Sequence, residues 1–126
     1  MDALIDELST RWPSLQTITI AGFSAGAQMV QRYAAFAQER PAGAARLRYV
    51  VADPGTWLYF DPVRPGPVDA PTCPALNQWK YGTDDLPAWL GRSAQEARRQ
   101  YAAADISYLE GVLDNGPGKG KAYRML

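Results

Sequence analysis

The 126-residue sequence contains no histidine and a single cysteine, Cys73. Histidine is the commonest general base and the commonest protein ligand of catalytic zinc, so no imidazole of this chain fills either role. One cysteine excludes a disulfide within the chain and any cluster of cysteine ligands around a metal. We therefore expect neither a metal centre nor a cofactor.

The chain also lacks an excess of charge, because 13 basic residues balance 13 acidic ones. Proteins that bind nucleic acid or anionic lipid electrostatically carry a basic patch, so neither partner is expected. No apolar run approaches the roughly 20 residues that span a bilayer. The amino-terminal MDALIDELSTRW is acidic and amphipathic, unlike a signal peptide. This length suits one domain, residues 1–126. The sequence does not indicate the cellular compartment or the oligomeric state.

Apolar residues follow helix-like and strand-like spacings in turn. Residues 2–10 have the spacing of a short amphipathic helix, and residues 16–22 are rich in β-branched side chains and predict a strand. Residues 25–39 return to spacings of three and four, which indicate a helix. Residues 47–53 have a continuous apolar core, typical of a strand covered on both faces in a parallel sheet. This order predicts an α/β fold.

Six of the ten prolines lie between Pro54 and Pro74. Repeated loss of backbone donors excludes regular structure there, so we predict a long proline-rich loop over residues 54–79. Loops of this length are usually functional or disordered, and aromatic residues such as Trp57 and Tyr59 argue against disorder. We expect a packed excursion over the sheet.

Three further elements are predicted after the loop. Residues 87–90 suit a short helix, and residues 93–103 a longer one opened by SAQE, whose serine and glutamate can cap each other's backbone amides. Residues 106–110 suit a third strand, and residues 115–126 form a flexible tail whose GPGKGK lacks the glycine spacing of a P-loop. The prediction is about three parallel strands with flanking helices.

The stretch GFSAG, residues 22–26, fits the G-x-S-x-G pattern between a predicted strand and a predicted helix. In such a turn the serine is strained, and the residues two before and two after it approach closely, which Gly22 and Gly26 permit. The helix dipole and the amide of Ala25 would stabilise a negative oxygen of a substrate. Ser24 is therefore a candidate nucleophile; the alternative is an N-cap in a tight connection.

Four stretches together resemble α/β-hydrolase-fold proteins that carry G-H-S-A-G-G-Q elbows: ITIAGFSAGAQ, LRYVVADPGTWLYFDPVRP, CPALNQWKYGTDDLP and YAAADISYLEGVLDN. The likeness covers nearly the whole chain up to Asn115. It implies a partial α/β-hydrolase fold and a serine hydrolase that acts on a small-molecule substrate with an ester or related acyl bond. Phe23 stands where such relatives often have a histidine, and Ala27 replaces a glycine, both outside the minimal motif.

The acid of a catalytic triad follows a strand in this fold, and Asp114 after ISYLEGVL matches that position. A turn aspartate in LDNG is the alternative. Asp53 is the competing acid, but the relatives carry asparagine there, so we expect it to support a turn. Phe23, Trp57 and Tyr59 are candidate pocket residues, although dense aromatics more often pack a loop onto a sheet.

Acyl transfer on serine needs a base, and this chain has no histidine to supply one. Removing a triad histidine costs about a millionfold in turnover, so the chain alone should be nearly inert. We expect an internal fragment of a larger hydrolase, because the resemblance also implies earlier strands, a second oxyanion donor and a later histidine. The alternatives are a non-catalytic relative whose aromatic loop binds a partner or ligand, and a small α/β module that dimerises through its sheet edge.

Overall fold

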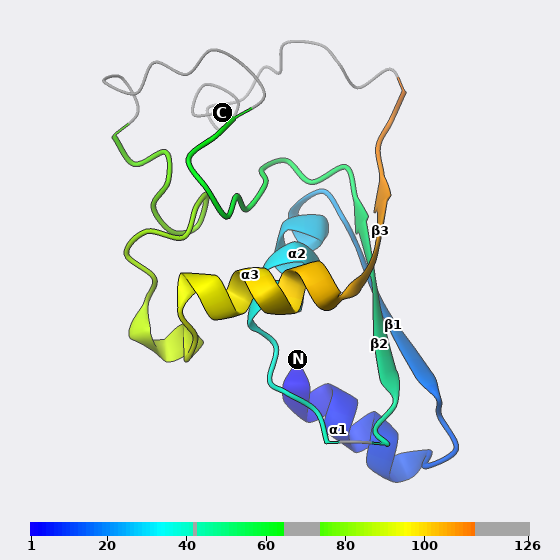
Figure 1. Cartoon of the computed structure of the whole chain (residues 1–126). Helices are drawn as coiled ribbons and strands as arrows, with labels where there is room; N and C mark the ends of the chain where they lie inside the picture. The colour runs from blue at the N-terminus through cyan, green and yellow to red at the C-terminus, as the bar shows by residue number, and fades with distance from the viewer. Residues whose placement is uncertain (42, 65–73, 113–126) are drawn as a thin grey trace.

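The computed structural model describes residues 1–41, 43–64 and 74–112 (Figure 1). Every predicted helix and strand is present, with ends within three residues of the predicted ones. The elements, in chain order, are α1 (Asp2–Arg11), β1 (Thr17–Phe23), α2 (Ala25–Phe36), β2 (Arg46–Ala52), the 3₁₀ helix η1 (Ala88–Leu90), α3 (Ala94–Ala103) and β3 (Asp105–Leu109).

The three strands form one parallel sheet in the order β1-β2-β3. At the carboxyl ends of the strands, the register places Phe23 beside Ala52 and Ala52 beside Leu109. This confirms the predicted α/β arrangement, with the motif-bearing strand β1 at one edge. Because all strands run the same way, the connections that leave β1, β2 and β3 start from one edge of the sheet, its carboxyl edge.

One face of the sheet carries the core, and all three helices lie on that side (Figure 1). Ile20, Tyr49 and Val51 are buried there together with Ile5 of α1 and Val30 of α2. Each fully buried aliphatic side chain stabilises the fold by about 1.5–3 kcal/mol. This cluster lies between the sheet and the helices, and a second buried cluster of Ala35, Leu58 and Ala97 joins α2, α3 and the segment after β2.

The opposite face of the sheet is open among the described residues. Thr19, Ala21 and Arg48 are exposed on it, and Val50 is half-buried. The prediction that residues 47–53 are covered on both faces was thus wrong for the described part of the chain. The apolar run misled because it indicates burial without showing whether one face of the strand or both are covered.

Helix α2 ends three residues earlier than predicted, because Ala37 adopts an extended ψ of 147°. Its terminal carbonyls are capped from a distance: Gln100 Nε2 donates to the oxygens of Ala34 and Ala37, both at 3.0 Å, and Arg92 Nη2 donates to Ala37 O at 2.8 Å. A cation at the negative end of a helix is favourable. These contacts attach α3 and the turn before it to α2.

Within the predicted loop, residues 54–64 and 74–79 contain neither helix nor strand. Residues 65–73, with Cys73, lie outside the described residues, as does the predicted tail 115–126. The predicted cap of α3 is confirmed, since Ser93 and Glu96 form a capping box.

Candidate functional site

Ser24 alone connects β1 to α2, and its backbone is strained. Its φ is 53° and its ψ −116°, a conformation that costs a residue with a β-carbon about 1–3 kcal/mol. Neighbouring contacts hold it there: Ser24 N donates to Ala52 O at 2.9 Å, and Gln28 N donates to Ser24 O at 3.2 Å. The serine is thus fixed to β2 on one side and to the first turn of α2 on the other.

A second serine shows what an ordinary N-cap looks like in this protein. Ser93 precedes α3 with φ −75° and ψ 161°, and its hydroxyl accepts a hydrogen bond from Glu96 N at 3.3 Å. Ser24 occupies the same position before α2, but its exposed side chain makes no capping hydrogen bond. Helix capping therefore does not account for the Ser24 hydroxyl.

The two motif glycines differ in how tightly they are packed. A β-carbon on Gly22 would lie 2.4 Å from both the carbonyl carbon and the oxygen of Gly26, and 2.7 Å from Ala27 N. A β-carbon on Gly26 would meet nothing within 4 Å. The predicted need for a small residue is confirmed at Gly22 and wrong at Gly26, because the strand side chain, not the helix one, would enter the contact between the two backbones.

The start of α2 presents backbone donors beside the serine. Ala25 is the first helical residue and is exposed. Amides of a first helical turn have no acceptor within the helix, and the helix dipole makes this end positive. The amide of Ser24 itself is occupied by Ala52, so Ala25 carries the nearest donor available to an anionic oxygen.

Asp53 leaves β2 at the same edge of the sheet and also has a positive φ, of 42°. Its amide donates to Leu109 O at 2.8 Å, and its Oδ1 accepts from Gly111 N at 2.6 Å. The expectation that Asp53 supports a turn agrees with these bonds, which reach across to the chain leaving β3. Asp114 lies outside the described residues.

The candidate pocket aromatics do not share one environment. The Trp57 ring is 5.7 Å from that of Tyr108 and packs against the core, and Tyr59 lies under the Arg64 guanidinium at 3.9 Å. Phe23, next to Ser24, is 68% exposed. Trp57 therefore packs the loop onto the core, the Tyr59 ring is covered by Arg64 of the same loop, and Phe23 projects into solvent beside the serine.

Polar side chains of α2, which sequence reasoning missed, hold the outgoing limb of the loop. Gln31 is 2% exposed; its Oε1 accepts from Leu58 N at 2.8 Å and its Nε2 donates to Leu58 O at 3.3 Å. One turn nearer Ser24, Gln28 Oε1 accepts from Thr56 Oγ1 at 3.0 Å. Polar residues at a spacing of three on an otherwise apolar helix are a signal that these positions bind polar groups, although the spacing does not identify the partners.

The returning limb is held by Arg32 of the same helix. Its Nη2 and Nε donate to Lys80 O at 2.7 and 3.1 Å, and burial lowers the pKa of its guanidinium. The two limbs also meet directly, since Tyr59 N donates to Tyr81 O at 3.0 Å. Leu58 within the proline-rich loop and Lys80 directly after it are thus bound to the helix that begins after Ser24.

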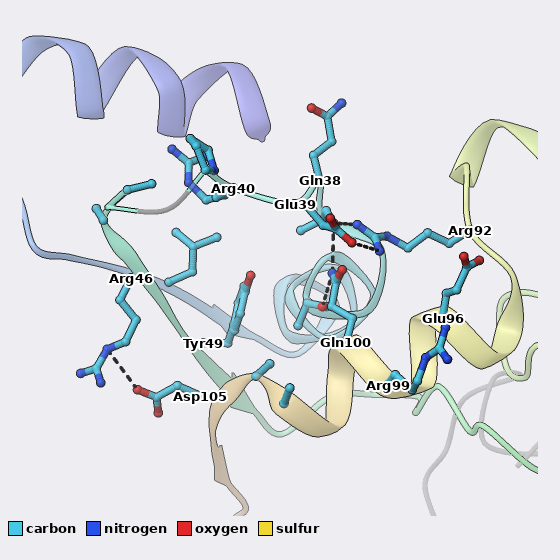
Figure 2. A pocket seen from close by; sticks show the side chains of 18 residues that line it. Gln38, Glu39, Arg40, Arg46, Tyr49, Arg92, Glu96, Arg99, Gln100 and Asp105 are labelled. Atoms are coloured by element: carbon cyan, nitrogen blue, oxygen red, sulfur yellow. Dashed lines mark hydrogen bonds and ion pairs between the residues drawn. The ribbon is translucent and has the colours of Figure 1, made fainter.

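A cavity of about 880 Å³ lies away from Ser24, at the edge of the sheet where β2 and β3 begin (Figure 2). Four of its charged side chains form two ion pairs: Arg92 lies 3.6 Å from Glu39, and Arg46 lies 3.9 Å from Asp105. Gln100 points to the end of α2, which it caps. These polar groups serve contacts within the fold, and Ser24 does not line this cavity.

The described residues contain neither a metal-binding group of side chains nor a membrane-spanning helix. No group of three or more His, Cys, Asp or Glu side chains there is placed to hold a metal ion. None of the described helices has the length and apolar character needed to cross a membrane. Comparisons with protein-family models, curated proteins and solved structures gave no significant match. The α/β-hydrolase resemblance therefore rests on the quoted sequence stretches.

Proposed function

We propose that Ser24 is the nucleophile of a serine hydrolase that acts on ester-like acyl bonds of a small-molecule substrate. The observation that carries the proposal is the exposed Ser24 hydroxyl, which caps nothing, on a backbone with a φ of 53° between a strand and a helix. Strain of this kind persists where the surroundings enforce it and often accompanies function. The resemblance of residues 18–28 to hydrolase elbows supports the same reaction class.

In the proposed reaction a base removes the Ser24 proton as Oγ attacks the substrate carbonyl carbon. The carbonyl electron pair moves to its oxygen, where the Ala25 amide and the start of α2 stabilise the negative charge. Collapse of this intermediate expels the alcohol, which takes the proton from the base, and leaves an acyl-serine. Water then attacks the acyl-serine by the same route and releases the acid.

The base in this proposal comes from outside these 126 residues, since the chain contains no histidine. Asp114 is the proposed acid that orients that base, because its position after the third strand matches the triad order of this fold. The isolated chain then supplies the nucleophile Ser24 and the oxyanion donor of Ala25, but it has no base to accept the Ser24 proton. A small diffusible base should restore part of what is missing.

The test is acylation of the purified chain by p-nitrophenyl acetate with and without added imidazole. Intact-mass spectrometry and peptide mapping should find one acetyl group on Ser24, formed faster with imidazole. The Ser24→Ala variant should not acquire it, and the matched Ser93→Ala variant should label like the wild type. Acylation spread over several residues, or unchanged by Ser24→Ala, would disprove the nucleophile.

A non-catalytic binding module is the second candidate, and the absence of histidine favours it. In that case the strand-to-helix turn is scaffold, and the docked aromatic loop is the functional surface. Added imidazole would then raise the acetylation rate of Ser24 no more than that of the other serines. The same mass-spectrometric comparison therefore decides between the two candidates.

A further inference from the structure

The three connections that leave the carboxyl edge of the sheet are tied to one another. Ser24 N, after β1, donates to Ala52 O at the end of β2. Asp53, directly after β2, reaches in the other direction and binds Leu109 O through its amide and Gly111 N through its carboxylate. These bonds form a continuous chain from the candidate nucleophile to the segment that follows β3.

We propose that Asp53 is a positioning residue that holds residues 109–112 in place against the turn of Ser24. This inference rests on the proposed function, because residues 109–112 lead in sequence to Asp114, the proposed acid. Asp53 acts through other groups: its carboxylate fixes the backbone that leaves β3, while its own backbone continues from Ala52, the acceptor for the Ser24 amide.

The residue type suits this task for two separate reasons. First, its φ of 42° lies in the left-handed region, where aspartate and asparagine occur several times more often than other residues with a β-carbon. Second, its short side chain places Oδ1 2.6 Å from Gly111 N, a charge-assisted hydrogen bond of the stronger kind. Asparagine supplies the same conformation and a neutral acceptor, whereas glycine supplies the conformation only.

This difference separates a positioning residue from a catalytic acid. A positioning residue needs an acceptor oxygen at Oδ1, so Asp53→Asn should preserve its role and Asp53→Gly should abolish it. A catalytic acid needs negative charge beside the base, so Asp53→Asn should abolish that role. Glycine is the matched control, because it removes the acceptor without straining the backbone.

The test is amide hydrogen exchange of Gly111, followed by NMR in the full 126-residue chain. In Asp53→Asn the exchange rate should rise by no more than about fivefold, because the acceptor remains but loses its charge. In Asp53→Gly it should rise by more than about tenfold, as expected for loss of a hydrogen bond to a charged acceptor. The amide of Tyr49, at the centre of the middle strand β2, reports any general loss of folding. Equal Gly111 rates in the wild type and Asp53→Gly, or no rescue by asparagine, would overturn the proposal.

Imidazole-assisted acylation of Ser24 supplies the functional readout. The asparagine variant should acylate at the wild-type rate, since its acceptor is intact. A loss of the imidazole-dependent rate in Asp53→Asn, with Gly111 exchange raised by no more than about fivefold, would assign Asp53 the role of the acid and overturn the positioning role. If the wild type does not acylate at all, the proposed function fails, while the exchange rates still decide whether Asp53 holds residues 109–112.

Discussion

Gly22 and Gly26 offer a sharp test, because the motif treats them alike and the structure does not. In Gly22→Ala the new methyl carbon would lie 2.4 Å from two backbone atoms of Gly26, about 1 Å inside a normal carbon contact of about 3.5 Å. Because the clashing atoms belong to the backbone, a change of side-chain rotamer cannot relieve the clash. We expect a destabilisation of about 3 kcal/mol, at the upper end of the usual range for overpacking.

Gly26→Ala is the matched control one turn away. Its methyl group would meet nothing within 4 Å, and the residue lies inside α2. Alanine is a better helix former than glycine by up to about 1 kcal/mol, so this variant should be as stable as the wild type or more so.

Urea unfolding followed by circular dichroism measures both variants. With a slope of about 1.5 kcal/mol/M, typical of small proteins, the midpoint of Gly22→Ala should fall by about 2 M and that of Gly26→Ala should stay level or rise by less than about 0.7 M. Equal midpoints for the two variants would refute the close contact between the end of β1 and the first turn of α2.

Three further changes test contacts elsewhere. Gln31→Leu leaves the buried amide and carbonyl of Leu58 without their partners and should lower the free energy of unfolding by about 1–3 kcal/mol in urea titrations. Ser93→Ala removes the α3 cap and should cost about 1 kcal/mol, whereas Ser24→Ala should cost less because Ser24 does not cap. Burial and the hydrogen bond with Tyr108 raise the pKa of Tyr101 above its ordinary value, so the unfolded chain loses this proton first. The stability should therefore be full below about pH 10 and decline above it, and Tyr101→Phe should lessen that decline in urea midpoints measured across this range.

Local signals predicted most of the architecture. The capping box of Ser93 and Glu96 spans three residues and needs no knowledge of the rest of the chain, so SAQE was sufficient to place the start of α3. The strand-helix-strand order likewise follows from spacing alone. The need for a small residue at Gly22 was predicted correctly because Gly22 approaches the backbone of Gly26, only four residues later in the chain.

The features that the sequence did not predict depend on partners far along the chain. Gln31 binds Leu58 and Arg32 binds Lys80, which lie 27 and 48 residues away, so no local pattern names these pairs. Gln100 and Arg92 cap α2 from a helix and turn that follow much later, and this packing places the end of α2. The open face of the sheet was missed for a related reason: an apolar run reports burial but not which layer provides it.

Backbone strain occurs at the residues on which the proposed function depends. Three residues other than glycine have a positive φ among those that the structure describes: Ser24, Asp53 and Asp85. Two of the three directly follow adjacent strands at the carboxyl edge, where one offers a free hydroxyl and the other binds the segment after β3. Each such residue costs about 1–3 kcal/mol, a large share of the 5–15 kcal/mol by which domains are stable. Glycine at either position would adopt a positive φ without that cost. At Asp53 the cost is offset in part by the hydrogen bond of its carboxylate to Gly111 N, whereas the Ser24 hydroxyl makes no capping bond and stays exposed, as the proposed nucleophile requires.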